Sequence, residues 1–146
     1  MATITSFEDL EIWKRAQELA EIIFTICNTN EKIIKDFSFK DQIKRAVLSI
    51  SNNIAEGFEY SNNNDFYRFL RIAKGSCGEV RNCLLFSVRI KYSNLEEIGI
   101  HIEMSRNLGK QIGSLMKYLK QNKATRQALP KQNPNPYPQL VIQCLH

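Results

Sequence analysis

The chain of 146 residues has the length of one domain, and 43% of its residues are hydrophobic, which is enough for a core. It holds no run of the roughly 18 apolar residues that span a membrane, no signal-peptide pattern, and four widely spaced cysteines that argue against a disulfide framework. We therefore expect a cytoplasmic protein with reduced thiols. The net charge of +5 is uneven: residues 1–36 hold seven acids and four bases, whereas residues 104–146 hold seven bases and no acid.

The first predicted helix runs from Phe7 to Asn28, and Thr5 and Glu8 have the spacing of a capping box at its start. Its first apolar flank consists of Trp13, Ala16, Ala20, Ile23 and Cys27. Its second apolar flank consists of Ile12, Leu19 and Ile26. The second flank has two interpretations: it widens the core-facing side of a helix packed between two neighbours, or it forms an oligomer interface.

A polar connection over residues 29–37 precedes the second predicted helix, which has Ser38 as its N-cap and ends at Gly57. Its apolar side is made by Ile43, Ala46, Val47, Ile50 and Ile54. Its other side carries Arg45, Ser49, Asn52, Asn53 and Glu56. Because serine and asparagine are mediocre helix formers, this second side indicates either a structural polar network that sets helix register or a catalytic site.

Capping candidates at residues 61–64 open the third predicted helix, and a capping-box pattern over residues 93–96 opens the fourth. The apolar positions of the third are Phe66, Phe69, Leu70, Ala73, Cys77, Val80 and Leu84. Those of the fourth are Leu95, Ile98, Ile102, Leu108, Ile112, Leu115 and Leu119. Short connections favour antiparallel neighbours, so we predict an all-α, antiparallel up-and-down four-helix bundle over residues 1–122.

Residues 123–146 form a Pro-rich tail to which we assign no role, although its end at residues 140–145 is apolar. That end is disordered, lies on its own bundle or adds to a neighbouring subunit. Within the third helix, the small residues from Gly75 to Gly78 are expected to admit a close helix crossing.

Cations gather on the last two predicted helices. Arg106, Lys110, Lys117 and Lys120 follow one stripe of the fourth helix, and Arg68 and Arg71 point away from the apolar side of the third. Rows of cations can track a phosphate backbone, or they can simply keep a protein soluble. The chain has no helix-turn-helix, zinc-finger or aromatic-sheet signature. If it binds nucleic acid, we therefore expect little reading of base sequence.

Signals for catalysis are few. His101 and His146 are the only histidines, and neither has a second ligand at a suitable spacing, so we expect no metal and no cofactor. The most enzyme-like set is Glu56 with Arg45, Ser49 and Asn53. We interpret this set as structural and expect no enzyme.

Three motifs carry a resemblance to a known family. The first is Phe7, Leu10, Trp13 and Ala16. The second is Gln42, Arg45, Ala46, Ser49, Ile50, Asn53, Ile54, Ala55, Glu56 and Gly57. The third is Phe66, Phe69, Leu70, Ile72, Ala73, Gly75, Ser76 and Glu79. With these motifs, the chain resembles the four-helix bundle proteins encoded in intervening sequences of bacterial 23S ribosomal RNA genes, to which the accessory variability proteins of diversity-generating retroelements are similar.

The resemblance covers about residues 7–119 and implies a homopentameric barrel without enzymatic activity. In the retroelement relatives it also implies a basic surface that engages nucleic acid and a reverse transcriptase. Glu59 and Tyr60 stand where family members often have Gly-Arg, which removes one cation here. We therefore expect a homo-oligomer that binds RNA or DNA phosphates, with ribosomal RNA or a reverse transcriptase as partner. The alternative is a protein-interaction scaffold without a nucleic-acid role.

Overall fold

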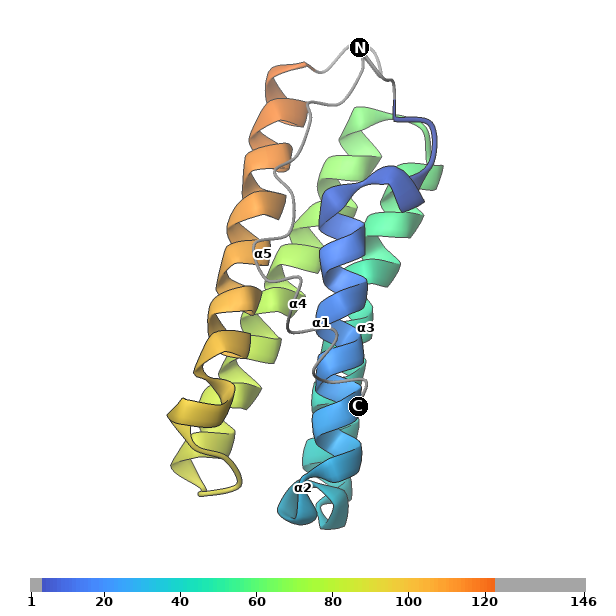
Figure 1. Ribbon diagram of the computed structural model, residues 1–146. Helices are drawn as coiled ribbons and strands as arrows, with labels where there is room; N and C mark the ends of the chain where they lie inside the picture. Colours follow the sequence, from blue (N-terminus) through green and yellow to red (C-terminus); the bar gives the residue numbers. More distant parts are fainter. Residues whose placement is uncertain (1–3, 123–146) are drawn as a thin grey trace.

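The computed structural model describes residues 4–122 (Figure 1). The described chain forms a 3-10 helix η1 (Phe7–Asp9) and the helices α1 (Glu11–Thr29), α2 (Glu31–Lys35), α3 (Phe37–Glu59), α4 (Asn63–Arg89) and α5 (Leu95–Gln121), without strands. The predicted all-α fold with four long helices is confirmed. No helix in this part of the chain is both long and apolar enough to cross a bilayer. The Pro-rich tail lies outside the described residues.

The four long helices lie side by side and alternate in direction along the chain, as Figure 1 shows. Helix α4 is central in the packing, because α3 and α5 both pack along it. Helix α1 packs on α3 and makes only a narrow contact with α5. The short helix α2 and the α4–α5 connection lie at the same end of the bundle.

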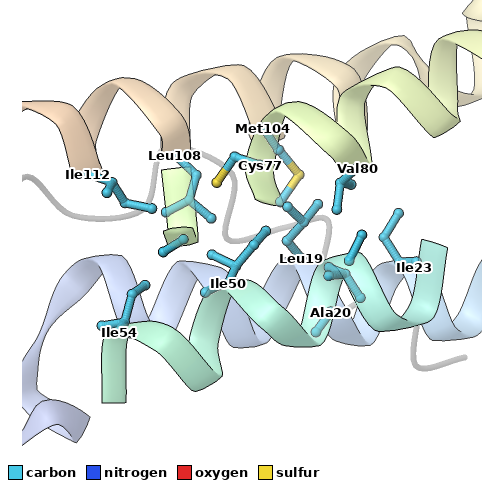
Figure 2. Packing of buried hydrophobic residues seen from close by; sticks show 14 of the residues in the cluster. Leu19, Ala20, Ile23, Ile50, Ile54, Cys77, Val80, Met104, Leu108 and Ile112 are labelled. Atoms are coloured by element: carbon cyan, nitrogen blue, oxygen red, sulfur yellow. The ribbon is translucent and has the colours of Figure 1, made fainter. Parts of the chain in front are cut away.

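Apolar side chains from all four long helices meet in one core, of which Figure 2 shows a part. Helix α1 contributes Leu19 and Ile23, and α5 contributes Met104 and Leu108. Each fully buried aliphatic side chain stabilises the fold by about 1.5–3 kcal/mol relative to exposure. The predicted apolar stripes are therefore the core-facing sides of the helices, except that Leu95 at the start of α5 is 59% exposed.

The first helix begins later than predicted. Residues Phe7–Asp9 form the separate turn η1, and Leu10 has extended backbone angles of φ −74° and ψ 125°. Neither η1 nor α1 has a side-chain hydrogen bond at its N-cap. The predicted capping box of Thr5 and Glu8 is therefore wrong.

The predicted connection over residues 29–37 contains helix α2. The Asn30 side chain accepts hydrogen bonds from the backbone amides of Lys32 and Ile33, and this starts the helix. Helix α3 is capped by Asp36, whose carboxylate accepts a hydrogen bond from the Phe39 amide at 3.0 Å. The prediction of Ser38 as the cap is thus wrong by two residues. The caps of α4 and α5 are Asn62 and Asn94, which lie within the predicted cap segments.

Gly57 does not end its helix, because α3 continues to Glu59. A Cβ atom at Gly57 would lie 2.5 Å from the Cβ of Phe69 on α4, much closer than real Cβ atoms approach. The glycine therefore serves packing between α3 and α4 and not helix termination.

Candidate nucleic-acid interface

Two glycines on α5 define how α4 and α5 meet. A Cβ on Gly109 would lie 3.5 Å from the Cβ of Cys77, and a Cβ on Gly113 would lie 3.4 Å from the Nζ of Lys74. The Lys74 side chain consequently lies over the seam between the two helices. Of the small residues from Gly75 to Gly78, Ser76 and Cys77 make close contacts with the neighbouring helices, whereas a Cβ on Gly75 or on Gly78 would meet no atom within 4 Å.

Lysines of α5 lie beside this seam on the outer side of the bundle. Lys110, Lys117 and Lys120 are exposed, and at about 100° per residue they occupy one stripe of α5. Because α4 and α5 are antiparallel and Lys74 meets Gly113, Arg71 comes level with Lys117 along the bundle, where it also lines a hollow with Phe69 and Ile72. We call Arg71, Lys74, Lys110, Lys117 and Lys120 the basic face.

The basic face has a high density of uncompensated charge. Within residues 4–122, no ion pair joins any of its five cations to a carboxylate. The other two predicted binding residues differ in this respect, since Arg68 pairs with Asp65 at 3.3 Å and Arg106 pairs with Glu103. Exposed pairs of this kind are weak, but they lower the charge that these two arginines present.

Lys74 belongs to the basic face although the sequence-based set of binding residues lacks it. Its position at the edge of the apolar stripe of α4 indicates packing when the helix is considered alone. In the packed bundle, its ammonium group lies beside Gly113 of α5, where the two helices meet at the surface. A lysine facing a glycine on the next helix is a signal that becomes visible only with the helix register.

The predicted polar network of α3 is only partly correct. Ser49 and Ser76 share a hydrogen bond of 2.8 Å between α3 and α4, and the Asn53 amide donates to the Ser49 carbonyl at 2.7 Å and to its hydroxyl at 3.0 Å. Arg45 instead pairs with Asp41, at 2.9 Å and with a mostly exposed side chain. Glu56 is exposed to solvent. Arg45 and Glu56 thus lie outside the network, which leaves no buried carboxylate beside these hydroxyls.

The second apolar flank of α1 is used inside the protomer. Ile12 and Leu19 are each 1% exposed, and Ile26 is half-buried against the core. The flank is therefore the wide core-facing side of a helix, the first of its two interpretations. Ile12 and Leu19 offer no surface to a second subunit, and the prediction that they form the oligomer interface is wrong.

The histidine and three cysteines of the described residues are buried in the core. His101 is buried on α5, and burial lowers the pKa of its imidazole. Cys27, Cys77 and Cys83 are free and buried, and burial raises the pKa of Cys77 to about 12. Such a thiol does not supply the thiolate that reactive cysteines need. No group of three or more possible metal ligands occurs between residues 4 and 122.

A family model described as 23S rRNA-intervening sequence protein matches residues 8–114, most of the described bundle. The chain belongs to this family. The chain is also similar to a crystal structure of a protein with unknown function from the S23 ribosomal protein family of Bacteroides thetaiotaomicron VPI-5482. The two share 24% sequence identity and superpose with a TM-score of 0.64 over 73% of this chain and 98% of the other. No curated protein matches the chain.

The match to the 23S rRNA-intervening sequence protein family includes both α4 and the greater part of α5. Of the basic face, Arg71, Lys74 and Lys110 fall within the match. Lys117 and Lys120 fall beyond it, in the last two turns of α5. The matched range therefore holds three of the five cations of the basic face.

Proposed function

We propose that this protein is a non-enzymatic homo-oligomer that binds the phosphate backbone of RNA through the basic face. The observation that carries the proposal is the set of five exposed cations on two rigid helices without a compensating carboxylate. The name of the family, which refers to ribosomal RNA, supports RNA over DNA. Arg68 and Arg106 lie near the face, but Asp65 and Glu103 offset their charge.

The chemistry of the basic face favours binding to phosphates over reading of bases. The five residues of the basic face are all lysine or arginine, although the exposed Tyr60 lies near its edge, because Tyr60 stacks on Phe69 and Phe69 lines a hollow with Arg71. Bases of a single strand are usually bound by stacking on aromatic side chains, so a face made of Lys and Arg indicates contacts with the backbone. If all five cations contact phosphates, the logarithm of the affinity falls with the logarithm of salt concentration with a slope of about −4 to −5.

Assembly into an oligomer would raise the affinity for RNA further. The family resemblance indicates a pentamer, whose five basic faces would bind one long RNA with an avidity above that of a single protomer. In a retroelement context, a reverse transcriptase would be the protein partner of the same assembly.

The test is binding of a fluorescent RNA hairpin across a salt series. The double variant Lys110→Glu with Lys117→Glu should lose most of the affinity and reduce the salt slope. Its matched control is Lys14→Glu with Lys35→Glu, which changes the net charge equally at exposed positions on α1 and α2 and should bind nearly like the wild type. Equal losses in both variants would indicate a general charge effect, and no binding at low salt would favour the scaffold function.

A further inference from the structure

A hollow near the start of α4 is continuous with the basic face. Its volume is about 310 Å³, and it is lined by Arg68, Phe69, Arg71 and Ile72. Arg71 belongs both to this lining and to the basic face. The Asn63 amide donates a hydrogen bond to the Asn122 carbonyl at 2.6 Å, which keeps this end of α4 beside the end of α5. The cations of the basic face therefore also attract an anionic ligand that enters the hollow.

Two stacked aromatic rings stand at the edge of this hollow. The Tyr60 ring stacks on Phe69, with centroids 5.2 Å apart and 13° between the ring planes. Phe69 itself lines the hollow. Tyr60 is 54% exposed, so much of the ring surface that Phe69 does not cover is open to solvent. An exposed aromatic ring of this kind can accept a further planar group by stacking.

Contacts inside the protomer hold both rings in place. Phe69 packs tightly on α3, because its Cβ lies 2.5 Å from the position that a Cβ of Gly57 would occupy. Tyr60 is the C-cap residue of α3, and its carbonyl accepts a hydrogen bond from the Asn62 side-chain amide at 3.3 Å. A ring that is ordered before a ligand arrives costs little conformational entropy on binding.

The cations of the hollow are suited to phosphate. Lys74, Arg71 and Arg68 follow one another at three-residue steps, about 60° apart around α4, and so extend the basic face toward the hollow. Arg71 is exposed and forms no ion pair within residues 4–122. Arg68 pairs with Asp65, but its side chain is 74% exposed, and a phosphate can compete with so weak a pair. The planar fork of donors on each guanidinium group matches two phosphate oxygens.

An exposed aromatic ring beside two arginines has the chemistry that binds a nucleotide, because a base stacks on the ring and the phosphate contacts the guanidinium groups. The volume of the hollow lies at the small end of the range of about 300–1,000 Å³ for ligand pockets, which suits one nucleotide. We propose that Tyr60, Arg68 and Arg71 bind an unpaired nucleotide of RNA, with its base on Tyr60. The inference rests on the proposed function and adds a preference for single-stranded segments, because the bases of a duplex are already paired and stacked.

The experiment measures fluorescence anisotropy with two labelled RNAs of equal length, a single strand of mixed sequence without secondary structure and a blunt duplex. Tyr60→Leu removes the ring and keeps an apolar side chain. Phe37→Leu is the matched control, because Phe37 is a 73% exposed aromatic residue at the opposite end of α3. Tyr60→Leu should weaken binding of the single strand by about fivefold or more and change binding of the duplex by less than about twofold. Phe37→Leu should bind both RNAs like the wild type.

Two further measurements separate stacking from a structural role of Tyr60. Tyr60→Phe keeps the ring and should bind the single strand like the wild type. Ultraviolet crosslinking of the wild type to the single strand, followed by mass spectrometry, should attach a nucleotide to Tyr60, and this measurement decides the question if circular dichroism shows that Tyr60→Leu is unfolded. Crosslinks that avoid Tyr60 would overturn the proposal.

The nucleotide site and the basic face can fail separately. If Tyr60→Leu binds the single strand like the wild type, or loses both RNAs equally, the nucleotide site is contradicted while the basic face stands. Loss of the single strand in Arg68→Gln but not in Tyr60→Leu would show an anion site without stacking and would also contradict it. Displacement of the single strand by adenosine monophosphate at an equal concentration of nucleotides would assign the hollow to a free nucleotide instead.

The double variant Lys110→Glu with Lys117→Glu tests the other proposal on the same RNAs. It should lose both the single strand and the duplex. If it binds both like the wild type while Tyr60→Leu loses the single strand, the basic face is contradicted and the nucleotide site stands.

Discussion

The Lys74 ammonium group of α4 lies over Gly113 of α5, with its Nζ atom 3.4 Å from the position that a Cβ of Gly113 would occupy. A residue on the third long helix thereby joins a row of lysines on the fourth. The basic face consequently belongs to the α4–α5 seam as a whole, and its charge can be altered from either helix.

Gly113→Glu should weaken RNA binding by about tenfold at moderate salt. The new carboxylate would pair with Lys74 and add a negative charge in the middle of the basic face. Asn52→Glu is the control, since it adds the same charge at an exposed position of α3, outside the basic face. Fluorescence anisotropy with labelled RNA measures both, and equal effects would remove Lys74 from the interface.

Gly57→Ala should lower the free energy of unfolding by about 1–2 kcal/mol, although alanine is the better helix former. The reason is the 2.5 Å separation between the added Cβ and the Cβ of Phe69, which forces α3 and α4 apart. Gly75→Ala is the matched control: its Cβ meets open space, so it should raise stability by about 0.5–1 kcal/mol. Urea denaturation gives both values. Stabilisation by both substitutions would show that Phe69 of α4 shifts to accept the added Cβ of residue 57 without cost.

The hydrogen bond between Ser49 and Ser76 should couple α3 to α4 by about 0.5–1.5 kcal/mol. A double-mutant cycle of Ser49→Ala and Ser76→Ala measures this coupling through chemical denaturation. Asn52→Ala, at an exposed position of the same α3 side, should change stability by less than about 0.5 kcal/mol. A coupling near zero would mean that each hydroxyl finds water or another partner as easily.

Acid should destabilise the protein through His101. Burial lowers the pKa of this imidazole, so between its folded and unfolded pKa values the unfolded chain binds more protons than the folded one. The contribution to stability is complete above the ordinary pKa near 6.5 and is lost as the pH falls below it, by at most about 1.4 kcal/mol for each pH unit.

Thermal melts of the wild type and of His101→Met at pH 7 and pH 5 test this expectation. Between pH 7 and pH 5, the melting temperature should fall further for the wild type than for the variant. Parallel losses would assign the acid sensitivity to other groups.

Much of the fold follows from local patterns along the chain. The three- and four-residue spacing of Ala16, Ala20 and Ile23 places them on one side of a helix whatever its neighbours are, and all three lie in the core. Asn62 and Asn94 precede amphipathic segments and cap α4 and α5, because a cap depends only on the amides of the following turn. The number of long helices, their direction and the family can therefore be predicted from the sequence.

Contacts between helices required the tertiary structure. The flank of Ile12 and Leu19 has the same pattern whether a neighbouring helix or another subunit covers it, and only the packed bundle shows that it is core. Gly57 has the pattern of a helix end, but the approach of Phe69 from α4 explains it as a packing residue. Lys74 joins the basic face because of a glycine 39 positions later. Sequence periodicity determines the side of a helix on which a residue lies, whereas the register between helices determines what that side meets.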